Sequence, residues 1–415
     1  MKLDGLRVID LSRFLPGPML TQFMADHGAE VIKIESVDEG EPTRAVGEIR
    51  DGISVFFANT SRGKKSLALD LKQPAGREAL MRLAEVSDVV IEAFRPGVAD
   101  RLGVGYQHIS VRAPHIVYAS ISAFGQSGPY RDLATHDLAI EAMAGVLSLN
   151  RGRDGAPAIP GLPAADMLAS MVTLSGVMMA LLRRKETGRG DFIDMAMADC
   201  LLAAIPNNLD TAMARRQQPD VREARSLGGN ALYAIYDTKD GDWIALGGQE
   251  MKFAVNLLTA LGRPDLIDLC RLPPGKGQAP VSDFLSASFR TKTKNEWVAY
   301  FKGRDIPFAP VQTLPEMLDD PHFRQRGAVI TDARGWDHIG NPIRFTDEPG
   351  RMRFEPPALG QHSQAILQML HYSELEIAQL KKDGTVKEAT PEDILRHSGL
   401  AEMAPVTCGQ KEPLA

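Results

Sequence analysis

Short apolar runs and amphipathic runs alternate along the first half of the chain. Residues 6–12 (LRVIDLS), 29–35 (AEVIKIE) and 115–124 (HIVYASISAF) are short and rich in β-branched residues, which predicts buried strands. Residues 19–28 (MLTQFMADHG) carry helical periodicity and end at Gly28. Alternation of strands and helices with short connections predicts an α/β fold, with a Rossmann-like parallel sheet covered by helices.

The second half of the chain has a different pattern. The apolar run 167–182 is short for a membrane span, contains Ser and Thr and ends in RRK, which predicts a buried core helix. A polar segment, 215–230, is typical of a linker. Residues 232–248 predict a hairpin with KDGD at its turn, and helical patterns follow it. We therefore expect a smaller α+β domain over 228–325 and a weakly patterned tail beyond about residue 385.

The composition narrows the class of protein. The chain has 415 residues, of which 44% are hydrophobic and 24% charged, and a formal net charge of −6, which argues against a nucleic-acid binder. Cys200, Cys270 and Cys408 lie far apart without a CxxC pair, so we expect neither a metal site nor disulfides. The first residues lack the apolar stretch of a signal peptide, and we expect a cytoplasmic protein that does not enter a membrane.

An imidazole and a carboxylate stand together before an apolar helical run in ATHDLAIEAMAG, residues 134–145. In one interpretation Asp137 caps the helix and His136 has no role. In the other, His136 faces a substrate. The pattern alone leaves both interpretations open.

Asp166 follows the Pro- and Gly-rich segment APAIPGLPAAD and opens the apolar run. A carboxylate at a helix start is usually a cap worth about 1 kcal/mol. Because this helix is apolar almost all round, its start is also expected to point into the protein or a cleft, where a partly dry carboxylate serves as a base or nucleophile. Helix starts near His136 and Asp166 would aim backbone N–H groups at one place, which suits an oxyanion.

Three further groups have both a structural and a functional interpretation. Glu250, in LGGQEMKF, is either a first-turn acid favoured by the helix dipole or part of a site. The loop NTSRGKKS, with Arg62, Lys64 and a further lysine, is either a solvated turn or a phosphate cradle.

Phe94, Arg95 and Arg101, in AFRPGVADRLG, place a ring and two guanidinium groups near a strand end. Ligands of open α/β sheets bind at such ends, and this set suits adenine and phosphate together. The first strand is not followed by GxGxxG, so no NAD site is expected.

Taken together, the motifs resemble the family III CoA-transferase superfamily, which includes formyl-CoA and carnitine CoA-transferases and the α-methylacyl-CoA racemases. The resemblance covers roughly residues 3–385. It is carried by LDGLRVIDLSRFLPGPMLTQFMADHGAEVIKIE, NTSRGKKSLALDLK, DVVIEAFRPGVADRLGVGY, SAFGQSGPYRDLATHD, RRKETGRGDFIDMAM, GGQEMKF and LGQHSQAIL.

The resemblance implies a large Rossmann-like domain completed by C-terminal residues, and two chains interlocked as a homodimer. The implied organisation is 1–214 for the first part of the large domain, 215–227 for a linker, 228–325 for the small domain, 326–385 for the return to the large domain and 386–415 for a tail. Coenzyme A would lie along the large domain as part of an acyl-CoA substrate. The implied contacts to it are Leu69, Lys72, Phe94, Arg95, Arg101, Asp137, Arg62 and Lys64.

The superfamily implies two competing chemistries. In the transferases an Asp at the position of Asp166 attacks an acyl-CoA, and an aspartyl-CoA thioester follows. In the racemases the aligned Asp works with a His and a Glu, and His136, Asp166 and Glu250 match all three positions. The segment 289–327 also resembles the racemase branch, so a racemase of 2-methyl-branched or similar acyl-CoA is favoured over a transferase.

Some positions depart from the racemase pattern. Asp166 is followed by MLAS, as in the transferases, where racemases have a Gly-rich run. Ser36 stands where some transferases have an Arg on CoA, and the chain is longer than typical racemases. A third hypothesis, a catalytically silent acyl-CoA binder, is disfavoured by the presence of all three polar positions. The acyl group itself is not identified by the sequence.

Overall fold

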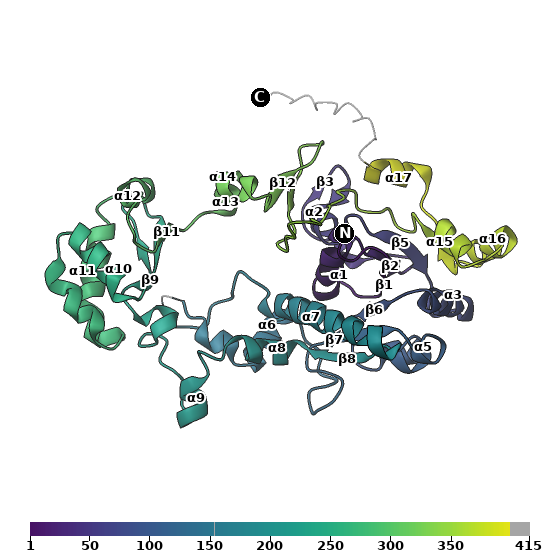
Figure 1. Cartoon of the computed structure of the whole chain (residues 1–415), viewed down its shortest axis with the longest axis horizontal. Helices are drawn as coiled ribbons and strands as arrows, with labels where there is room; N and C mark the ends of the chain where they lie inside the picture. Colours follow the sequence, from purple (N-terminus) through teal and green to yellow (C-terminus); the bar gives the residue numbers. More distant parts are fainter. Residues whose placement is uncertain (153, 399–415) are drawn as a thin grey trace, which may run out of the picture. The chain divides into compact units, whose positions relative to one another are not determined.

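The computed structural model describes residues 1–152 and 154–398 and divides into two compact units (Figure 1). The large unit comprises Met1–Ile140, Leu162–Leu201 and, among the described residues, 322–398. The small unit comprises Glu141–Gly161 and Leu202–Pro321. The division differs from the predicted one, because the chain leaves the large unit at Leu202 and the small unit also takes the segment that precedes residue 162. Hydrophobic periodicity does not assign that Gly- and Pro-rich segment to either unit.

A seven-stranded sheet forms the centre of the large unit, in the order β14-β5-β2-β1-β6-β7-β8. Six of these strands are parallel, and β14 pairs antiparallel with β5. This confirms the predicted α/β fold with a sheet that is mainly parallel. The strands are β1 (Arg7–Asp10), β2 (Glu30–Glu35), β5 (Lys65–Leu69), β6 (Val89–Glu92), β7 (Val117–Ser122), β8 (Phe192–Ala196) and β14 (Val386–Lys387).

Apolar side chains cover both faces of this sheet, as expected for parallel strands. Alternate residues of β1 belong to different clusters, since Val8 packs with α1 and α7 while Ile9 packs with α3, α5, α15 and α16. The α-helices of the large unit are α1 (Pro16–Asp26), α2 (Val55–Ser61), α3 (Pro74–Glu85), α4 (Val98–Arg101), α5 (Tyr106–Arg112), α6 (Asp137–Met143), α7 (Ala164–Thr187), α8 (Met197–Ala204), α14 (Pro321–Gln325), α15 (Ser363–Met369), α16 (Glu374–Lys382) and α17 (Pro391–Ser398). Two small hairpins accompany them, β3 (Ile49–Arg50) with β4 (Ile53–Ser54) and β12 (Val329–Thr331) with β13 (Asp337–Ile339).

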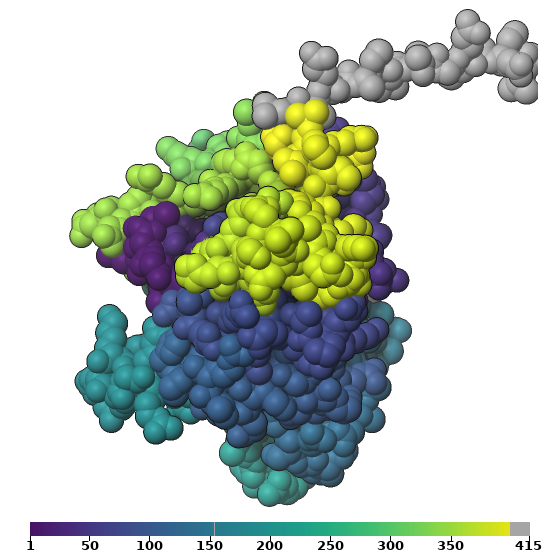
Figure 2. All heavy atoms as spheres, turned by 90° about the vertical axis from the view of Figure 1, so that its right-hand side faces the viewer, coloured from purple at the N-terminus to yellow at the C-terminus, as the bar shows by residue number. Residues whose placement is uncertain are grey.

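The C-terminal part of the chain completes the large unit. Strand β14 extends the sheet at β5, and α15 and α16 cover one face of it. Figure 2 shows these yellow segments lying against the blue segments from the first part of the chain. The predicted tail, 386–415, therefore begins with a strand of the main sheet and continues as α17, whereas residues 399–415 lie outside the described part of the chain.

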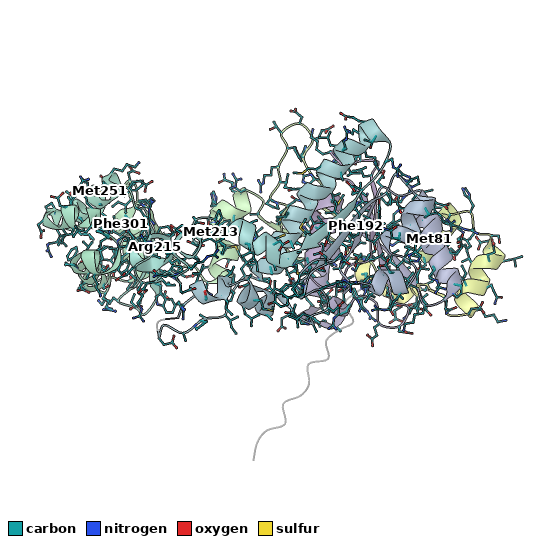
Figure 3. The ribbon with its side chains drawn as sticks, turned by 90° about the horizontal axis from the view of Figure 1, so that it is seen from below. Met81, Phe192, Met213, Arg215, Met251 and Phe301 are labelled. Carbon is teal, nitrogen blue, oxygen red and sulfur yellow. The ribbon has the colours of Figure 1, made fainter. Side chains whose placement is uncertain are left out.

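The small unit has its own antiparallel sheet, in the order β11-β10-β9. The predicted hairpin is confirmed, since β9 and β10 pair antiparallel and Thr238 N–H donates to the carbonyl of Asp242 across the turn. Phe289, Trp297 and Phe301 form an aromatic core, and Phe301 is labelled in Figure 3. The elements are α9 (Asp210–Arg215), β9 (Tyr233–Asp237), β10 (Trp243–Gly247), α10 (Met251–Ala260), α11 (Ala279–Phe289), α12 (Lys294–Phe301), β11 (Phe308–Pro310) and α13 (Leu314–Asp319).

Helix α7 is the predicted apolar core helix, and it is only partly buried. By length and composition it could cross a membrane, and within its most apolar window 33% of the residues are buried. One side, with Ala169 and Val177, packs on the sheet of the large unit. The other side exposes Val172, Met179 and Leu182, with exposed fractions of 41%, 70% and 68%. An apolar face thus remains uncovered in the single chain.

Candidate active site

Asp166 and Asp137 belong to the first turns of two helices that meet in the large unit. Asp166 opens α7 after Pro163, and Asp137 opens α6. The backbone N–H of Asp166 donates a 3.0 Å hydrogen bond to Oδ1 of Asp137. The first N–H groups of a helix lack partners within the helix, and the Asp137 carboxylate supplies an acceptor for one of them. Asp137 therefore links the starts of the two helices.

The carboxyl group of Asp166 is an unusually weak acid in this setting. Burial, assisted by the negative charge of Asp137, raises the pKa of Asp166 from 3.8 to about 7. Within the residues that the structure describes, no cation pairs with its carboxylate. The group therefore changes charge near neutral pH, as a proton donor or acceptor in catalysis must.

His136 directly precedes α6. The next residue in the chain is Asp137, whose carboxylate accepts the backbone N–H of Asp166. Its backbone carbonyl accepts the N–H groups of Ala139 (3.0 Å) and Ile140 (3.2 Å), which begins the helix. The side chain of His136 is exposed and has no partner among the described residues. Since neighbouring Cα atoms are about 3.8 Å apart, the backbone of His136 lies next to Asp137, whose carboxylate accepts the N–H of Asp166. Their catalytic roles stay predictions.

Glu250 lies in the small unit, at the residue before α10, where its carbonyl accepts the N–H of Phe253 at 2.9 Å. Its side chain is exposed and makes no capping hydrogen bond. The loop before it is tightly packed, because a Cβ on Gly248 would lie 2.3 Å from Pro307. Glu250 is thus the N-cap residue of α10 and not, as the sequence predicts, part of its first turn, and its part in a site stays a prediction.

Four of the eight predicted CoA contacts lie at one edge of the main sheet. Leu69 ends β5 and Lys72 follows it, while Phe94 and Arg95 follow β6, so all four lie at the carboxyl edge of parallel strands. Lys72 and Arg95 are exposed, and Phe94 is half-buried. This is the edge at which open α/β sheets bind ligands.

Glu92 holds the backbone of this edge in place, and sequence reasoning did not single it out. Its buried carboxylate accepts the N–H of Phe94 at 2.7 Å. Burial raises the pKa of Glu92 to about 7. An acid that ends a fully apolar run, as in VVIEAF, is the signal that could have found it.

A second arginine joins Arg101 at Gly97, and sequence reasoning missed it. Gly97 has φ of 79° and precedes α4. A Cβ at Gly97 would lie 3.3 Å from Nη1 of Arg101 and 3.4 Å from Nη2 of Arg131. Arg131 is oriented by a 2.9 Å hydrogen bond from its Nε to the carbonyl of Gln126. Two guanidinium groups that approach one half-buried glycine backbone suit a phosphate group.

Arg62 and Lys64 do not join these residues. Both precede β5, and both are 3% exposed. The ammonium group of Lys64 donates to Asp10 at 3.1 Å, to Thr21 at 2.7 Å and to the carbonyl of Pro18 at 2.8 Å, inside the protein. Lys64 therefore belongs to a buried hydrogen-bond network. Its pairing with Asp10 offsets the high cost of burying an isolated charge. The structure leaves it no free N–H group for a phosphate.

Comparison with known proteins agrees with this arrangement. A profile of CoA-transferase family III matches residues 3–363. The chain is 32% identical to mouse succinyl-CoA:glutarate CoA-transferase over 400 residues, which is 93% of this chain and 90% of that protein. It is 33% identical to human α-methylacyl-CoA racemase over 401 residues, 93% of this chain and 98% of that protein.

Solved structures show the same fold. A CaiB/BaiF family protein from Brucella suis superimposes with a TM-score of 0.77 at 31% identity, and the match covers 89% of this chain and 99% of that chain. Among the described residues no group of three or more His, Cys, Asp or Glu is placed to hold a metal ion. The sheet, the carboxyl-edge residues and the profile match lead to one assignment: this chain belongs to CoA-transferase family III.

Proposed function

We propose that the protein is a racemase that inverts the α-carbon of 2-methyl-branched or similar acyl-CoA thioesters by proton transfer. The observation that carries this proposal is the half-buried carboxyl group of Asp166, with a pKa of about 7, whose backbone N–H is bonded by Asp137, the residue that follows the exposed His136. A transfer of one proton to each face of a carbon needs one base and one acid of this kind. The relatives named as α-methylacyl-CoA racemases support the same reaction.

In one direction His136 removes the α-proton, and the electron pair of the C–H bond moves to the thioester oxygen as an enolate. Asp166, as the carboxylic acid, then returns a proton to the opposite face of the carbon. The reverse direction uses the Asp166 carboxylate and the protonated imidazole. The enolate needs N–H donors, each worth about 3–4 kcal/mol. The amide of Asp166 is not one of them, because Asp137 already accepts it.

The pH dependence separates this reaction from acyl transfer. The pair must hold one proton, so we expect kcat/KM for α-proton exchange to fall as the pH rises above about 7, where Asp166 loses its proton. The rate is measured from pH 5.5 to 9 with each enantiomer of a 2-methylacyl-CoA. Both enantiomers should give one profile, since the two required states hold the same number of protons. A rate that rises through pH 7 and then stays level contradicts the proposal.

CoA transfer is the second candidate function, and the relatives named as CoA-transferases favour it. Here the ionised Asp166 attacks the thioester carbonyl and expels CoA thiolate, so that a mixed anhydride of Asp166 and the acyl group remains. The thiolate then attacks the aspartyl carbonyl of this anhydride. The acyl group departs as a carboxylate, and an aspartyl-CoA thioester is formed. An acceptor acid takes CoA by the reverse steps. This route needs ionised Asp166 and does not need His136 as a base, so its rate should rise through pH 7.

We propose that Arg101 and Arg131 hold phosphate groups of CoA at Gly97. Replacing Arg131 by Ala should raise KM for acyl-CoA about tenfold and leave kcat within a factor of three, because a charge-assisted contact remote from the reacting carbon is lost. Initial rates over a range of acyl-CoA concentrations check this. The matched control is Arg183→Ala, an exposed arginine at the far end of α7, which should change neither constant. A fall in kcat alone for Arg131→Ala would contradict the assignment.

We also propose that the protein is a homodimer and acts in the cytoplasm. The uncovered face of α7, with Val172, Met179 and Leu182, has the spacing of a helix-packing seam, and exposed apolar patches of this kind mark interfaces. Cys200 and Cys270 are free thiols, which fits a reducing compartment.

Replacing Met179 by Lys should separate the two chains, because a charge would be buried in an apolar contact. Light scattering after size exclusion should give twice the 45.2 kDa chain mass for the wild type and a single chain mass for the variant. The control is Leu375→Lys in α16, where the leucine is 84% exposed outside this face. A monomeric wild type, or a fully dimeric Met179→Lys, would contradict the proposed seam.

A further inference from the structure

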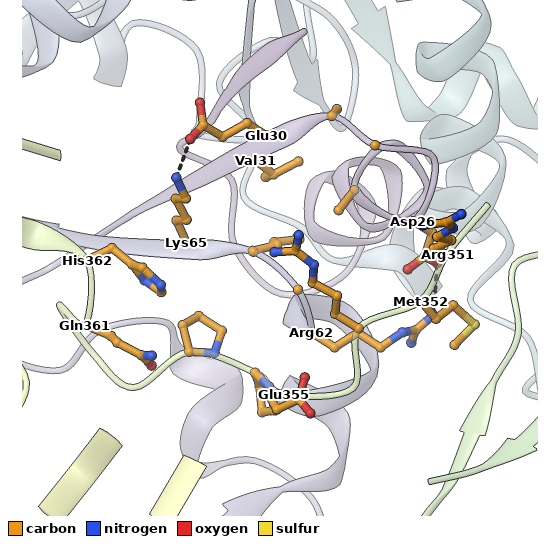
Figure 4. A pocket seen from close by; sticks show the side chains of 18 of the residues that line it. Asp26, Glu30, Val31, Arg62, Lys65, Arg351, Met352, Glu355, Gln361 and His362 are labelled. Carbon is orange, nitrogen blue, oxygen red and sulfur yellow. Dashed lines mark hydrogen bonds and ion pairs between the residues drawn. The ribbon is translucent and has the colours of Figure 1, made fainter. Parts of the chain in front are cut away.

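A cavity of about 790 Å³ opens at the amino ends of β2 and β5 (Figure 4). This is the edge of the sheet opposite to Lys72, Phe94 and Arg95, which follow the carboxyl ends of strands. Its volume is within the range of about 300–1,000 Å³ of small-molecule sites. The proposed reaction uses no residue of this cavity.

Positive charge exceeds the available acceptors in its wall. The carboxylates of Asp26 and Glu30 are already engaged by Arg62 and Lys65. Arg351 and Arg353 also line the cavity, and within the described part of the chain neither has an ion-pair partner. Asp4, which also lines the cavity, is paired with the amino terminus, and Glu355 is the remaining acid in the wall. The wall therefore has unused cationic donors.

Arg62 presents a rigid donor to the same cavity. Its guanidinium group is fixed by Asp26 at 3.0 Å and by the carbonyls of Asn59 at 3.0 Å and Ile339 at 3.1 Å. The side chain is 3% exposed, and its Nε–H is buried without any partner. A buried donor without an acceptor is costly and calls for an explanation such as an absent ligand.

His362, from the LGQHS motif that the proposed reaction does not use, supplies another N–H. Its Nδ1 accepts the backbone N–H of Ser66 at 3.1 Å, so the proton of the neutral ring is on Nε2. Burial, assisted by the charge of Lys65, lowers the pKa of His362 to about 4, and the ring is neutral at pH 7. In Figure 4 the ring projects from its strand-edge segment into the space between Lys65 and Gln361.

We propose that this cavity binds a small multiply charged oxyanion, a phosphate ester or a polycarboxylate, at a site separate from that of acyl-CoA. Arg353, Arg351 and the Arg62 Nε–H would hold the charged oxygens, with the His362 Nε2–H as a neutral donor. Val31, Pro356 and Pro357 give the cavity apolar wall for the organic part of such a ligand.

Calorimetric titration of the full chain with pyrophosphate, inorganic phosphate and citrate, at saturating CoA, tests this proposal. We expect one equivalent of at least one of these probes to bind, and Arg353→Ala to weaken its binding tenfold or more. Preference for pyrophosphate or phosphate would identify the phosphate-ester class, and preference for citrate the polycarboxylate class. Arg189→Ala, at an exposed arginine between α7 and β8, is the control and should bind as the wild type does.

Two results would overturn the proposal. One is that none of the three probes binds when CoA is present. A probe that binds only without CoA would occupy the phosphate contacts of CoA and not a separate site. The other is equal binding by Arg353→Ala and the wild type. Arg353 is exposed, so its replacement is not expected to unfold the chain. The readout is anion binding and not turnover, so the test stands whichever reaction the protein catalyses.

Discussion

Replacing Asp166 by Asn is expected to lower the rate of inversion at the α-carbon, and of α-proton exchange from the enantiomer whose proton faces Asp166, by about 10³-fold or more while leaving the chain folded. Asn keeps the shape of the side chain and loses the exchangeable proton, and general acid–base groups contribute about 10²–10⁴-fold. The backbone N–H that donates to Asp137 remains in the variant. Exchange is measured by mass spectrometry on a 2-methylacyl-CoA at pH 7, and CoA transfer should be lost as well.

The same variant should be more stable than the wild type at alkaline pH. The folded-state pKa of Asp166, about 7, lies above its unfolded value near 3.8, so the folded chain binds the extra proton between these values. Stability is therefore lost as the pH rises from about 4 to 7, by at most about 4 kcal/mol. The amide of the Asp166→Asn variant does not ionise and would not cause this loss. Thermal unfolding at pH 8 should therefore show a higher Tm for the variant than for the wild type.

The matched control is Asp199→Asn, an exposed first-turn aspartate of α8. It should change neither turnover nor the pH dependence of stability. An Asp166→Asn protein that keeps a tenth or more of the wild-type rate of inversion would show that Asp166 is only a helix cap. An unchanged Tm at pH 8 would show that its carboxyl group is not buried as described.

Replacing His136 by Ala should reduce inversion, and α-proton exchange from the enantiomer whose proton faces His136, by about 10²–10⁴-fold and leave the fold unchanged. The side chain is exposed, and the contacts that begin α6 come from its backbone carbonyl, which the variant retains. Any transfer of CoA between two acids should survive, because attack by Asp166 needs no imidazole. Exchange and CoA transfer are measured in parallel with the same acyl-CoA.

His108→Ala, at an exposed histidine of α5 in the same unit, is the control for loss of an imidazole. It should retain full exchange. If His136→Ala also retained full exchange, the bystander interpretation of His136 would hold. If it lost exchange and CoA transfer together, its role would be binding or structure and not that of a base.

The main sheet could be predicted because its strands are short apolar runs bounded by helices, as in β1, β2 and β7. Strand β14 could not, since two residues carry no periodicity and the pairing with β5 brings together Leu69 and Val386 from opposite ends of the chain. The exposed face of α7 was also missed. Its residues are apolar all round, and periodicity then cannot tell a side that packs on the sheet from one left uncovered.

The candidate site shows the same division between local and long-range information. The weak acidity of Asp166 follows from an apolar helix start and could be expected from the sequence. The link through Asp137 joins residues 29 positions apart and needed the fold. The convergence of Arg101 and Arg131 on Gly97 could also be found only from the fold. The same holds for the pairing of Lys64 with Asp10, because a run of basic residues has the same sequence pattern whether it is solvated or buried.

The central claim is that His136 and Asp166 exchange the α-proton of an acyl-CoA with water. The most direct measurement is NMR of one enantiomer of a 2-methylacyl-CoA in deuterated water, with the protein and without any acceptor acid. We predict that deuterium enters Cα as the other enantiomer forms, and that the other enantiomer does not form with Asp166→Asn. Retention of the proton at Cα, together with CoA transfer once an acid is added, would contradict the claim.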